Sequence, residues 1–297
     1  MKLPSRAAIE HRHVDLGEVR IHCASCGRGP LIVFLHGFPQ CWYTFRHQLA
    51  DFGRDHLALA PDLRGYNLSS KPHGLEQYGP WPAAEDTKAL VEHLGYERFV
   101  LVGHDWGAAT AWTFALHHPE LLSALVILAT PHPATFDRAL HRDSEQQEAS
   151  QYLLALRGAH AQGALEYDEF ALLRDALDQP FLDQRDRDRY LESWRQPGAL
   201  AGMLRWYERE GLGPPDNGTP ARGNYAPQVT PLKVSVPTLV IYPTADLYTR
   251  PAAHRGLEQY VTDLQFQEIE GASHWIAEEH PQLVNRRIRD FLDLPLR

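Results

Sequence analysis

The sequence has few cysteines and no long run of apolar or basic residues. Its 297 residues include three cysteines, Cys23, Cys26 and Cys41, an odd number that suits a reducing compartment better than a disulfide framework. No stretch approaches the ~18 apolar residues of a membrane-spanning helix, and the N-terminus has no apolar signal core. The net charge of −9 comes without a basic run. We therefore expect a cytoplasmic protein with no membrane and no nucleic-acid partner.

Metal-ligand spacing is also missing from the sequence. Cys23 and Cys26 form a lone C-x-x-C pair, without the second ligand pair or following helix that a zinc or redox role needs. We expect neither a metal nor a cofactor. The hydrophobic content of 43% is enough for a sizeable core, and the length suits one large α/β domain or one domain with an insertion.

Short apolar strands alternate with helices in the first 130 residues. A hairpin at a sheet edge is predicted over 11–26. Strands and helices then follow in turn, and the alternation is typical of a mostly parallel sheet covered on both faces. The strands are predicted at 31–35, 56–60, 99–102, 123–129, 237–242 and 264–269, and the helices of this part at 42–52, 82–94, 108–118 and 281–292.

Between residues 131 and 231 the strand signal stops. Helical patterns take its place at 144–157, 164–177, 183–194 and 199–210, before a Gly-, Pro- and Asn-rich loop over 211–228. The charge run 183–189 is most simply a solvated helix face. We predict a helical cap domain, 131–231, inserted into a core domain made of 1–130 and 232–297. The insert lies on the side where strands end, which is where α/β active sites lie.

One reactive side chain stands between two glycines in the segment FVLVGHDWGAA, residues 99–109. The glycines let the chain turn sharply from a strand into a helix. This is the form of a nucleophile elbow, with Asp105 where many hydrolases carry serine. A carboxylate there is ionised at neutral pH and attacks carbon directly. The five residues 103–107 also fit an ordinary turn in which Asp105 caps the helix. Other parts of the chain are needed to distinguish this turn from a nucleophile elbow.

Two further polar residues follow strands in the order that hydrolases use. Asp246 comes after the strand 237–242, and His274 after the strand 264–269, which gives the order nucleophile, acid, histidine. The segment HGFP, 36–39, follows another strand and would place the N–H of Phe38 beside that of Trp106 as an oxyanion hole. Pro39 has no N–H, and the Phe38–Pro39 bond is a candidate for the cis form.

Four segments together resemble the α/β-hydrolase superfamily, specifically the branch of soluble epoxide hydrolases with an aspartate nucleophile. They are HGFPQCWYTFRHQL (36–49), PDLRGYNLSSKP (61–72), GHDWGAATAW (103–112) and GASHW (271–275). The resemblance spans essentially the whole chain. It implies an α/β-hydrolase core with a mostly parallel sheet, an inserted helical cap, and a substrate pocket bounded by His36, Pro39, Trp106 and Trp275.

The resemblance also implies two cap tyrosines whose hydroxyls hold the epoxide oxygen. GMLRWY (202–207) carries this role onto Tyr207, and ASQYLL (149–154) carries it onto Tyr152. Phenols with a pKa near ~10 remain protonated donors at neutral pH, which suits them to an alkoxide leaving oxygen. In some relatives a polar residue follows the first tyrosine, where this chain has Leu153.

The implied reaction converts a small apolar epoxide and water to a vicinal diol. Asp105 would form a covalent ester, and neutral His274, oriented by Asp246, would activate water. Apolar cap residues suit aryl or alkyl epoxides. The implied role is detoxification or catabolism by a monomer or homodimer.

Two alternatives remain at this point. The elbow and HGFP are shared with haloalkane dehalogenases, and the Trp106 indole could donate to halide, although many of these enzymes have Asn where this chain has Phe38. Fluoroacetate dehalogenases carry arginines on the elbow helix, and residues 106–112 have none. A hydrolase fold that only binds ligand is the second alternative, against which the intact Asp105, Asp246 and His274 argue.

Overall fold

A computed structural model describes residues 8–226 and 230–293. It contains an eight-stranded sheet in the order β1-β2-β4-β3-β5-β6-β7-β8. β1 and β2 form the predicted hairpin at one edge, β2 pairs antiparallel with β4, and the other neighbours are parallel. The strands are β1 (Glu10–Asp15), β2 (Arg20–Cys26), β3 (Leu31–Leu35), β4 (Leu57–Pro61), β5 (Phe99–His104), β6 (Leu122–Leu128), β7 (Thr238–Pro243) and β8 (Leu264–Ile269).

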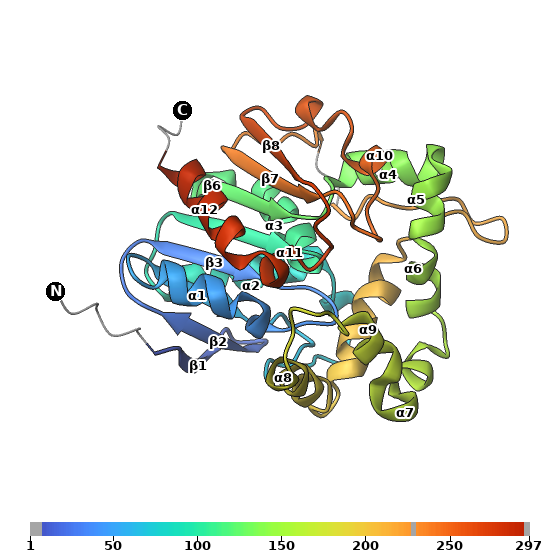
Figure 1. The fold of residues 1–297 in the computed structure, drawn as a ribbon, viewed down its shortest axis with the longest axis horizontal. Coiled ribbons are helices and arrows are strands. Elements are labelled where there is room, and N and C mark those ends of the chain that lie inside the picture. The colour runs from blue at the N-terminus through green and yellow to red at the C-terminus, as the bar shows by residue number, and fades with distance from the viewer. Residues whose placement is uncertain (1–7, 227–229, 294–297) are drawn as a thin grey trace.

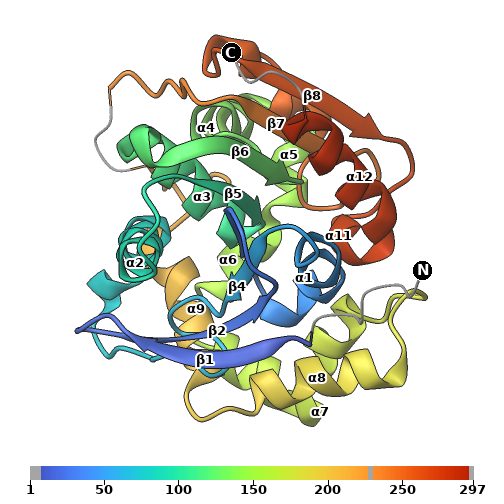
Figure 2. The ribbon, with the colours of Figure 1, turned by 90° about the vertical axis from the view of Figure 1, so that its left-hand side faces the viewer.

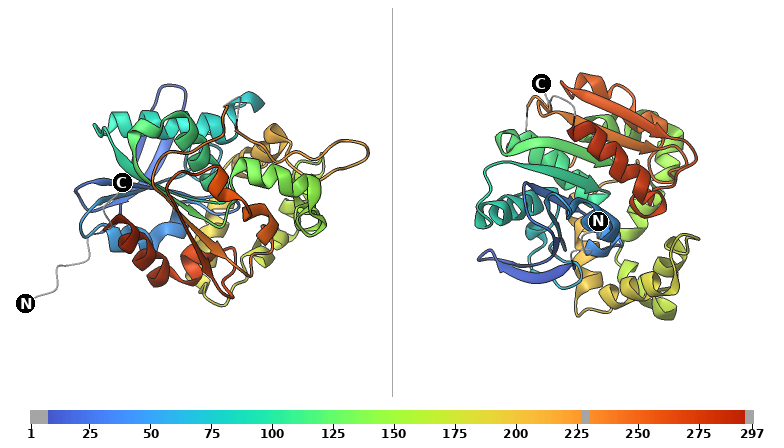
Figure 3. Two further views of the ribbon diagram at one scale, coloured as in Figure 1. Left: turned by 90° about the horizontal axis from the view of Figure 1, so that it is seen from above. Right: turned by 60° about the vertical axis from the view of Figure 1, so that its left-hand side comes forward.

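Helices cover both faces of the sheet. α1 (Arg46–Phe52), α11 (Ile276–Glu279) and α12 (Pro281–Leu292) lie on one face, with α2 (Pro80–His93) and α3 (Trp106–His117) on the other (Figures 1 and 3). Figure 2 shows the twist of the sheet between these two layers. β3 and β5 are buried along their whole length. That burial explains why they read as unbroken apolar runs rather than alternating ones.

The chain between β6 and β7 is helical as far as α9. Its helices are α4 (Pro133–Arg142), α5 (Ser144–Ala149), α6 (Gln151–Leu156), α7 (Ala161–Ala176), α8 (Gln184–Trp194) and α9 (Ala199–Glu210). α6 to α9 lie together beyond the end of the sheet (Figure 1). Shorter pieces elsewhere are η1 (Trp42–Phe45), η2 (Leu75–Gln77), η3 (Pro119–Leu121), α10 (Pro251–His254) and η4 (Leu257–Gln259).

Several predicted boundaries were wrong. The helix expected over 42–52 begins as the 3-10 helix η1. The helix expected over 144–157 is divided into α5 and α6 at Ser150, whose backbone (φ −99°, ψ 5°) leaves the helical region. α4 was not predicted; it begins with Pro133 at its first turn and is capped by His132, whose ring accepts from the N–H of Ala134.

The charged segment before and in α8 is not wholly a solvated face. Asp183 and Asp186 form a capping box at its start. Asp186 is also buried and pairs with Arg46 of α1, 3.1 Å away. One residue of the run therefore ties the helical segment to the sheet domain. Within the described ranges, no helix is both long and apolar enough to cross a bilayer.

Candidate active site

Asp105 sits in the sharp turn between β5 and α3. Its backbone has φ 53° and ψ −124°, an unusual conformation for a residue with a Cβ and one typical of functional sites. Three glycines make the turn possible. A Cβ on Gly107 would lie 2.0 Å from the carbonyl oxygen of Leu35, and one on Gly37 would lie 2.0 Å from Oδ1 of Asp105. At Gly103 it would lie 2.5 Å from the carbonyl oxygen of Gly107.

Backbone N–H groups point at the Asp105 carboxylate. The N–H of Phe38 donates to Oδ1 at 2.7 Å, and the N–H of Trp106 also binds this carboxylate. The Phe38–Pro39 peptide is cis. The two donors named from the sequence are therefore brought together, one from the loop after β3 and one from the first residue of α3.

His274 lies between two carboxylates. Its Nδ1–H donates to Oδ2 of Asp246 at 2.7 Å, and its Nε2 is 3.7 Å from Oδ2 of Asp105. Asp246 is fully buried and also accepts from the backbone N–H groups of Tyr248 (2.7 Å) and Thr249 (3.1 Å). Its many donors fix the acid in one orientation, so the His274 ring is fixed as well.

The surroundings of Asp105, Asp246 and His274 determine which of these groups carry a charge. Burial alone would lower the pKa of His274, but the carboxylates of Asp246 and Asp105 raise it to about 10. Burial alone would raise the pKa of Asp105, yet its neighbour His274 and the N–H of Trp106 hold it below the usual value. In the free protein, His274 is thus an imidazolium between two carboxylates at neutral pH.

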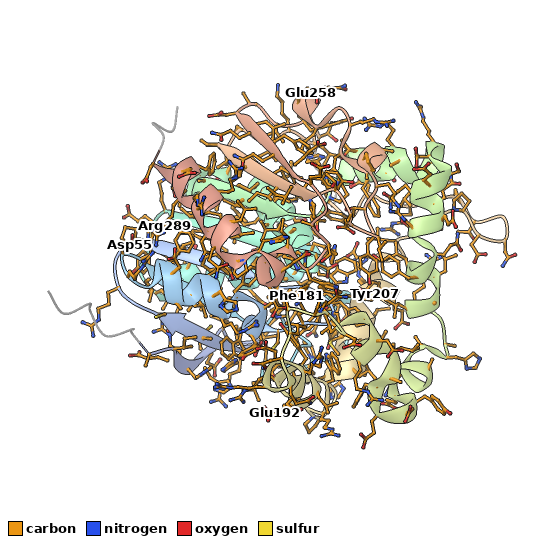
Figure 4. The ribbon with its side chains drawn as sticks, viewed as in Figure 1. Asp55, Phe181, Glu192, Tyr207, Glu258 and Arg289 are labelled. Atoms are coloured by element: carbon orange, nitrogen blue, oxygen red, sulfur yellow. The ribbon has the colours of Figure 1, made fainter. Side chains whose placement is uncertain are left out.

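Tyr152 and Tyr207 reach the site from the helical segment, on α6 and α9. Burial, and then the charge of Asp105, raises the pKa of both phenols well above the ordinary value, so both stay protonated. The Tyr207 ring packs edge-on against Trp106 (5.1 Å) and Phe38 (5.2 Å). Figure 4 shows Tyr207 at the boundary between the sheet domain and the helices beyond it.

Two cavities meet at Asp105. Both are lined by Asp105, Tyr152, Tyr207, Tyr248 and His274. The outer cavity, of about 720 Å³, is otherwise mostly apolar, and its rim carries the half-exposed Leu172. The second cavity, called the inner cavity below, has a volume of about 500 Å³. Further lining residues of the outer cavity include Pro39, Leu156, Leu165, Leu173 and Trp275, and those of the inner cavity include Trp106, Phe136, Leu153, Leu212 and Tyr225.

His36, expected in the pocket, lines neither cavity. It is completely buried, its Nε2 accepts from the N–H of Leu63 at 3.0 Å, and its Nδ1 lies 3.1 Å from the carbonyl oxygen of Gly37. Burial lowers the pKa of His36, which is therefore a neutral support for two loops.

The sequence reasoning missed Tyr248. Its ring packs edge-on between Tyr152 (5.1 Å) and His274 (4.9 Å), so it links Tyr152 of α6 to His274. Its position two residues after Asp246 was the available signal. Across the described residues, no cluster of three or more His, Cys, Asp or Glu side chains is placed to hold a metal ion.

This elbow and triad, on a sheet of this topology, define an α/β hydrolase. The chain belongs to that family: the family described as "alpha/beta hydrolase fold" matches residues 30–281. Among its members, the chain resembles epoxide hydrolases. It is 33% identical to epoxide hydrolase 3 of Xenopus tropicalis over 98% of this chain and 80% of the relative.

A second relative supports the family, and a solved structure supports both the fold and the resemblance to epoxide hydrolases. The chain is 32% identical to the AB hydrolase superfamily protein YfhM of Bacillus subtilis, over 96% of this chain and 98% of the relative. A solved structure of a Bacillus megaterium epoxide hydrolase in complex with an inhibitor matches with a TM-score of 0.89 and 34% identity. The match covers 95% of this chain and all of that one.

Proposed function

We propose that the protein is an epoxide hydrolase that converts an apolar epoxide and water to a vicinal diol. The observation that carries the proposal is the arrangement around Asp105: an ionised carboxylate and two protonated tyrosines, Tyr152 and Tyr207, line the same cavities. A nucleophile and acids aimed at one small space suit the opening of a strained C–O–C ring.

In the first step, Asp105 attacks an epoxide carbon and the C–O bond of the ring breaks. Tyr152 and Tyr207 donate hydrogen bonds to the epoxide oxygen, and one of them gives its proton to the alkoxide that forms. The product is a hydroxyalkyl ester of Asp105. The mostly apolar lining of the outer cavity supports aryl or alkyl substituents on the epoxide.

Ester formation removes the negative charge of Asp105, and this changes His274. With one of its two carboxylate neighbours neutralised, the pKa of His274 falls, and the imidazolium releases its proton through water to the tyrosinate left by the first step. The neutral ring then takes a proton from water, and the hydroxide attacks the ester carbonyl. The N–H groups of Phe38 and Trp106 hold the resulting oxyanion, and the diol leaves as Asp105 re-forms.

The structural division supports separate tasks for the two parts of the chain. We assign residues 1–130 and 232–297 to the core, which would supply Asp105, Asp246 and His274. Residues 131–231 would form the cap, which supplies Tyr152 and Tyr207. We propose a cytoplasmic role in detoxification or catabolism of epoxides, with the low, odd number of cysteines as its support.

The test is the intact mass of the His274→Gln variant after exposure to aryl and alkyl epoxides, with haloalkanes run in parallel. The substitution leaves alkylation possible and blocks hydrolysis of the ester. We expect an adduct equal to one whole epoxide, which should be absent when Asp105→Ala is added to the same variant.

Two other outcomes of this experiment would replace the proposed function with a different one. An adduct equal to a haloalkane less its halide, with none from epoxides, would assign the protein as a dehalogenase. No adduct from either series, together with saturable ligand binding, would make it a binding protein with a hydrolase fold.

A further inference from the structure

Tyr225 lies where the chain returns from the helical segment to the sheet domain. Its side chain is 5% exposed, and its hydroxyl donates to the carbonyl oxygen of Pro131 at 3.1 Å. Pro131 stands at the opposite crossing, just after β6. One hydrogen bond therefore joins the outgoing and returning connections, and it holds the Tyr225 ring in the wall of the inner cavity.

A third cavity, the side cavity, lies on the other side of Tyr225. Its volume is about 770 Å³, and Tyr225 is the one residue that lines both it and the inner cavity among the described cavities. Trp81, which is 36% exposed, stands at its rim. The Tyr225 ring is therefore a wall that the inner and side cavities share, and the side cavity reaches toward the surface at Trp81.

The two spaces differ in chemistry. Phe136, Leu212 and Tyr225 line the inner cavity, whereas Arg209, Glu210 and Arg222 line the side cavity. Glu210 lines the side cavity and not the inner cavity, and burial together with the charge of Glu210 raises the pKa of Tyr225. The ring separates an apolar compartment from a charged one.

We infer that Tyr225 is a specificity-determining residue, a partition that closes the inner cavity and limits the length of the epoxide substituent lodged there. The inference rests on the proposed function. A substituent that reaches Tyr225 has no further apolar space, and each additional methylene must be left outside or must displace the ring. Removing the ring would join the inner and side cavities into one longer channel.

The test compares Tyr225→Ala with Tyr225→Phe on 1,2-epoxybutane, 1,2-epoxyhexane and 1,2-epoxydecane. Phe keeps the ring and loses only the bond to Pro131, so it is the matched control. We expect Tyr225→Ala to raise the ratio of kcat/KM for the longest epoxide to that for the shortest by about tenfold or more. Tyr225→Phe should leave this ratio unchanged. An unchanged ratio in an active Tyr225→Ala enzyme would overturn the inference.

Two further measurements keep the result clear. If Tyr225→Ala does not fold, Tyr225→Leu shortens the wall while keeping apolar bulk, and the same ratio decides. If the wild type opens no epoxide, the proposed function fails on its own. The partition is then judged from the binding of unreactive n-alkyl amides, whose chain-length limit should lengthen in Tyr225→Ala and not in Tyr225→Phe; an unchanged limit would overturn it.

Discussion

His104 and His274 are joined by a hydrogen bond from the ring of the first to the backbone of the second. Nε2 of His104 lies 2.8 Å from the carbonyl oxygen of His274. Burial and the neighbouring His274 lower the pKa of His104 to about 4, so the ring is neutral and its Nε2 carries the hydrogen. Because His104 directly precedes Asp105, this bond fixes the sharp turn at Asp105 to the loop that carries His274.

Replacing His104 with Leu should slow hydrolysis of the ester more than its formation. The loss of the bond frees the His274 loop while leaving the Asp105 turn in place, and misplacing a base by a fraction of an ångström costs about tenfold or more in rate. Pre-steady-state kinetics should show a larger burst of alkylated enzyme and a shifted pH–rate profile. Equal effects on both steps would contradict a positioning role.

Asp246→Asn should leave alkylation largely intact and slow ester hydrolysis by about 10² to 10⁴-fold. The amide cannot stabilise the imidazolium and favours the wrong orientation of the His274 ring. Intact mass during turnover should show the ester accumulating. If steady-state turnover falls without any accumulated ester, Asp246 acts on the first step instead.

The same variant changes the pH dependence of stability. The folded-state pKa of His274 is raised to about 10, from 6.5 as its ordinary value. Its contribution to stability is therefore full below pH 6.5 and is lost as the pH rises through about 10. Urea denaturation of the wild type should lose stability over this range more steeply than Asp246→Asn, and parallel curves would show that Asp246 does not set this pKa.

Glu210→Gln should stabilise the protein at alkaline pH. Burial raises the pKa of Glu210 to about 7, above the ordinary 4.5, so the folded state disfavours the ionised form. The cost is absent below pH 4.5, where the group is protonated in both states, and is complete above pH 7. We expect a gain of roughly 1 to 3 kcal/mol at pH 8 that shrinks toward zero near pH 4.5. A gain independent of pH would point to packing rather than charge.

Arg46→Met should destabilise the fold by about 3 to 5 kcal/mol. Arg46 pairs with Asp186 of α8 and with Glu278 of α11, whose side chain is fully buried. Met keeps much of the volume and leaves two carboxylates without their cation. Chemical denaturation gives the loss, and Arg54→Met, which removes an exposed pair with Asp51, is the control with an expected change under about 1 kcal/mol. Equal losses in the two variants would refute the special role of the buried pair.

The core of the site could be predicted because its residues follow strand ends. Asp105, Asp246 and His274 each stand just after a short apolar run, and parallel strands bring such positions to one edge. β3, β5 and β7 were predictable as apolar runs because every residue in them is buried, whereas β8, with only Ile269 buried, follows an alternating pattern. The N–H of Phe38 was located for the same reason, from the loop after β3.

Long-range packing explains what the sequence did not reveal. Asp186 lies in a run of alternating charges that a solvated helix would also show, and only its contact with Arg46 distinguishes it. His36 was expected to line the pocket. Its ring is instead held in the interior by the hydrogen bond that it accepts from the N–H of Leu63, a contact that the sequence does not reveal. The break at Ser150 depends on how α5 and α6 pack, because local propensity alone favours one continuous helix.

The helical segment is inserted between two strands that remain neighbours. β6 and β7 pair directly, from Leu125 with Thr238 to Leu128 with Ile241, although the inserted segment lies between them in the chain. Asp105, Asp246 and His274 all lie outside the insert, whereas Tyr152 and Tyr207 come from within it. The insert still contacts the loop of Asp246, because Gln146 of α5 donates to the carbonyl oxygen of Tyr248 (2.9 Å) and accepts from the N–H of Arg250 (2.8 Å). Under the proposed function, the sheet domain holds the carbon-attacking carboxylate and its water-activating partner, and the insert holds the groups that protonate the leaving oxygen. On that proposal, exchanging the inserted segment would exchange the leaving group that the same carboxylate can displace.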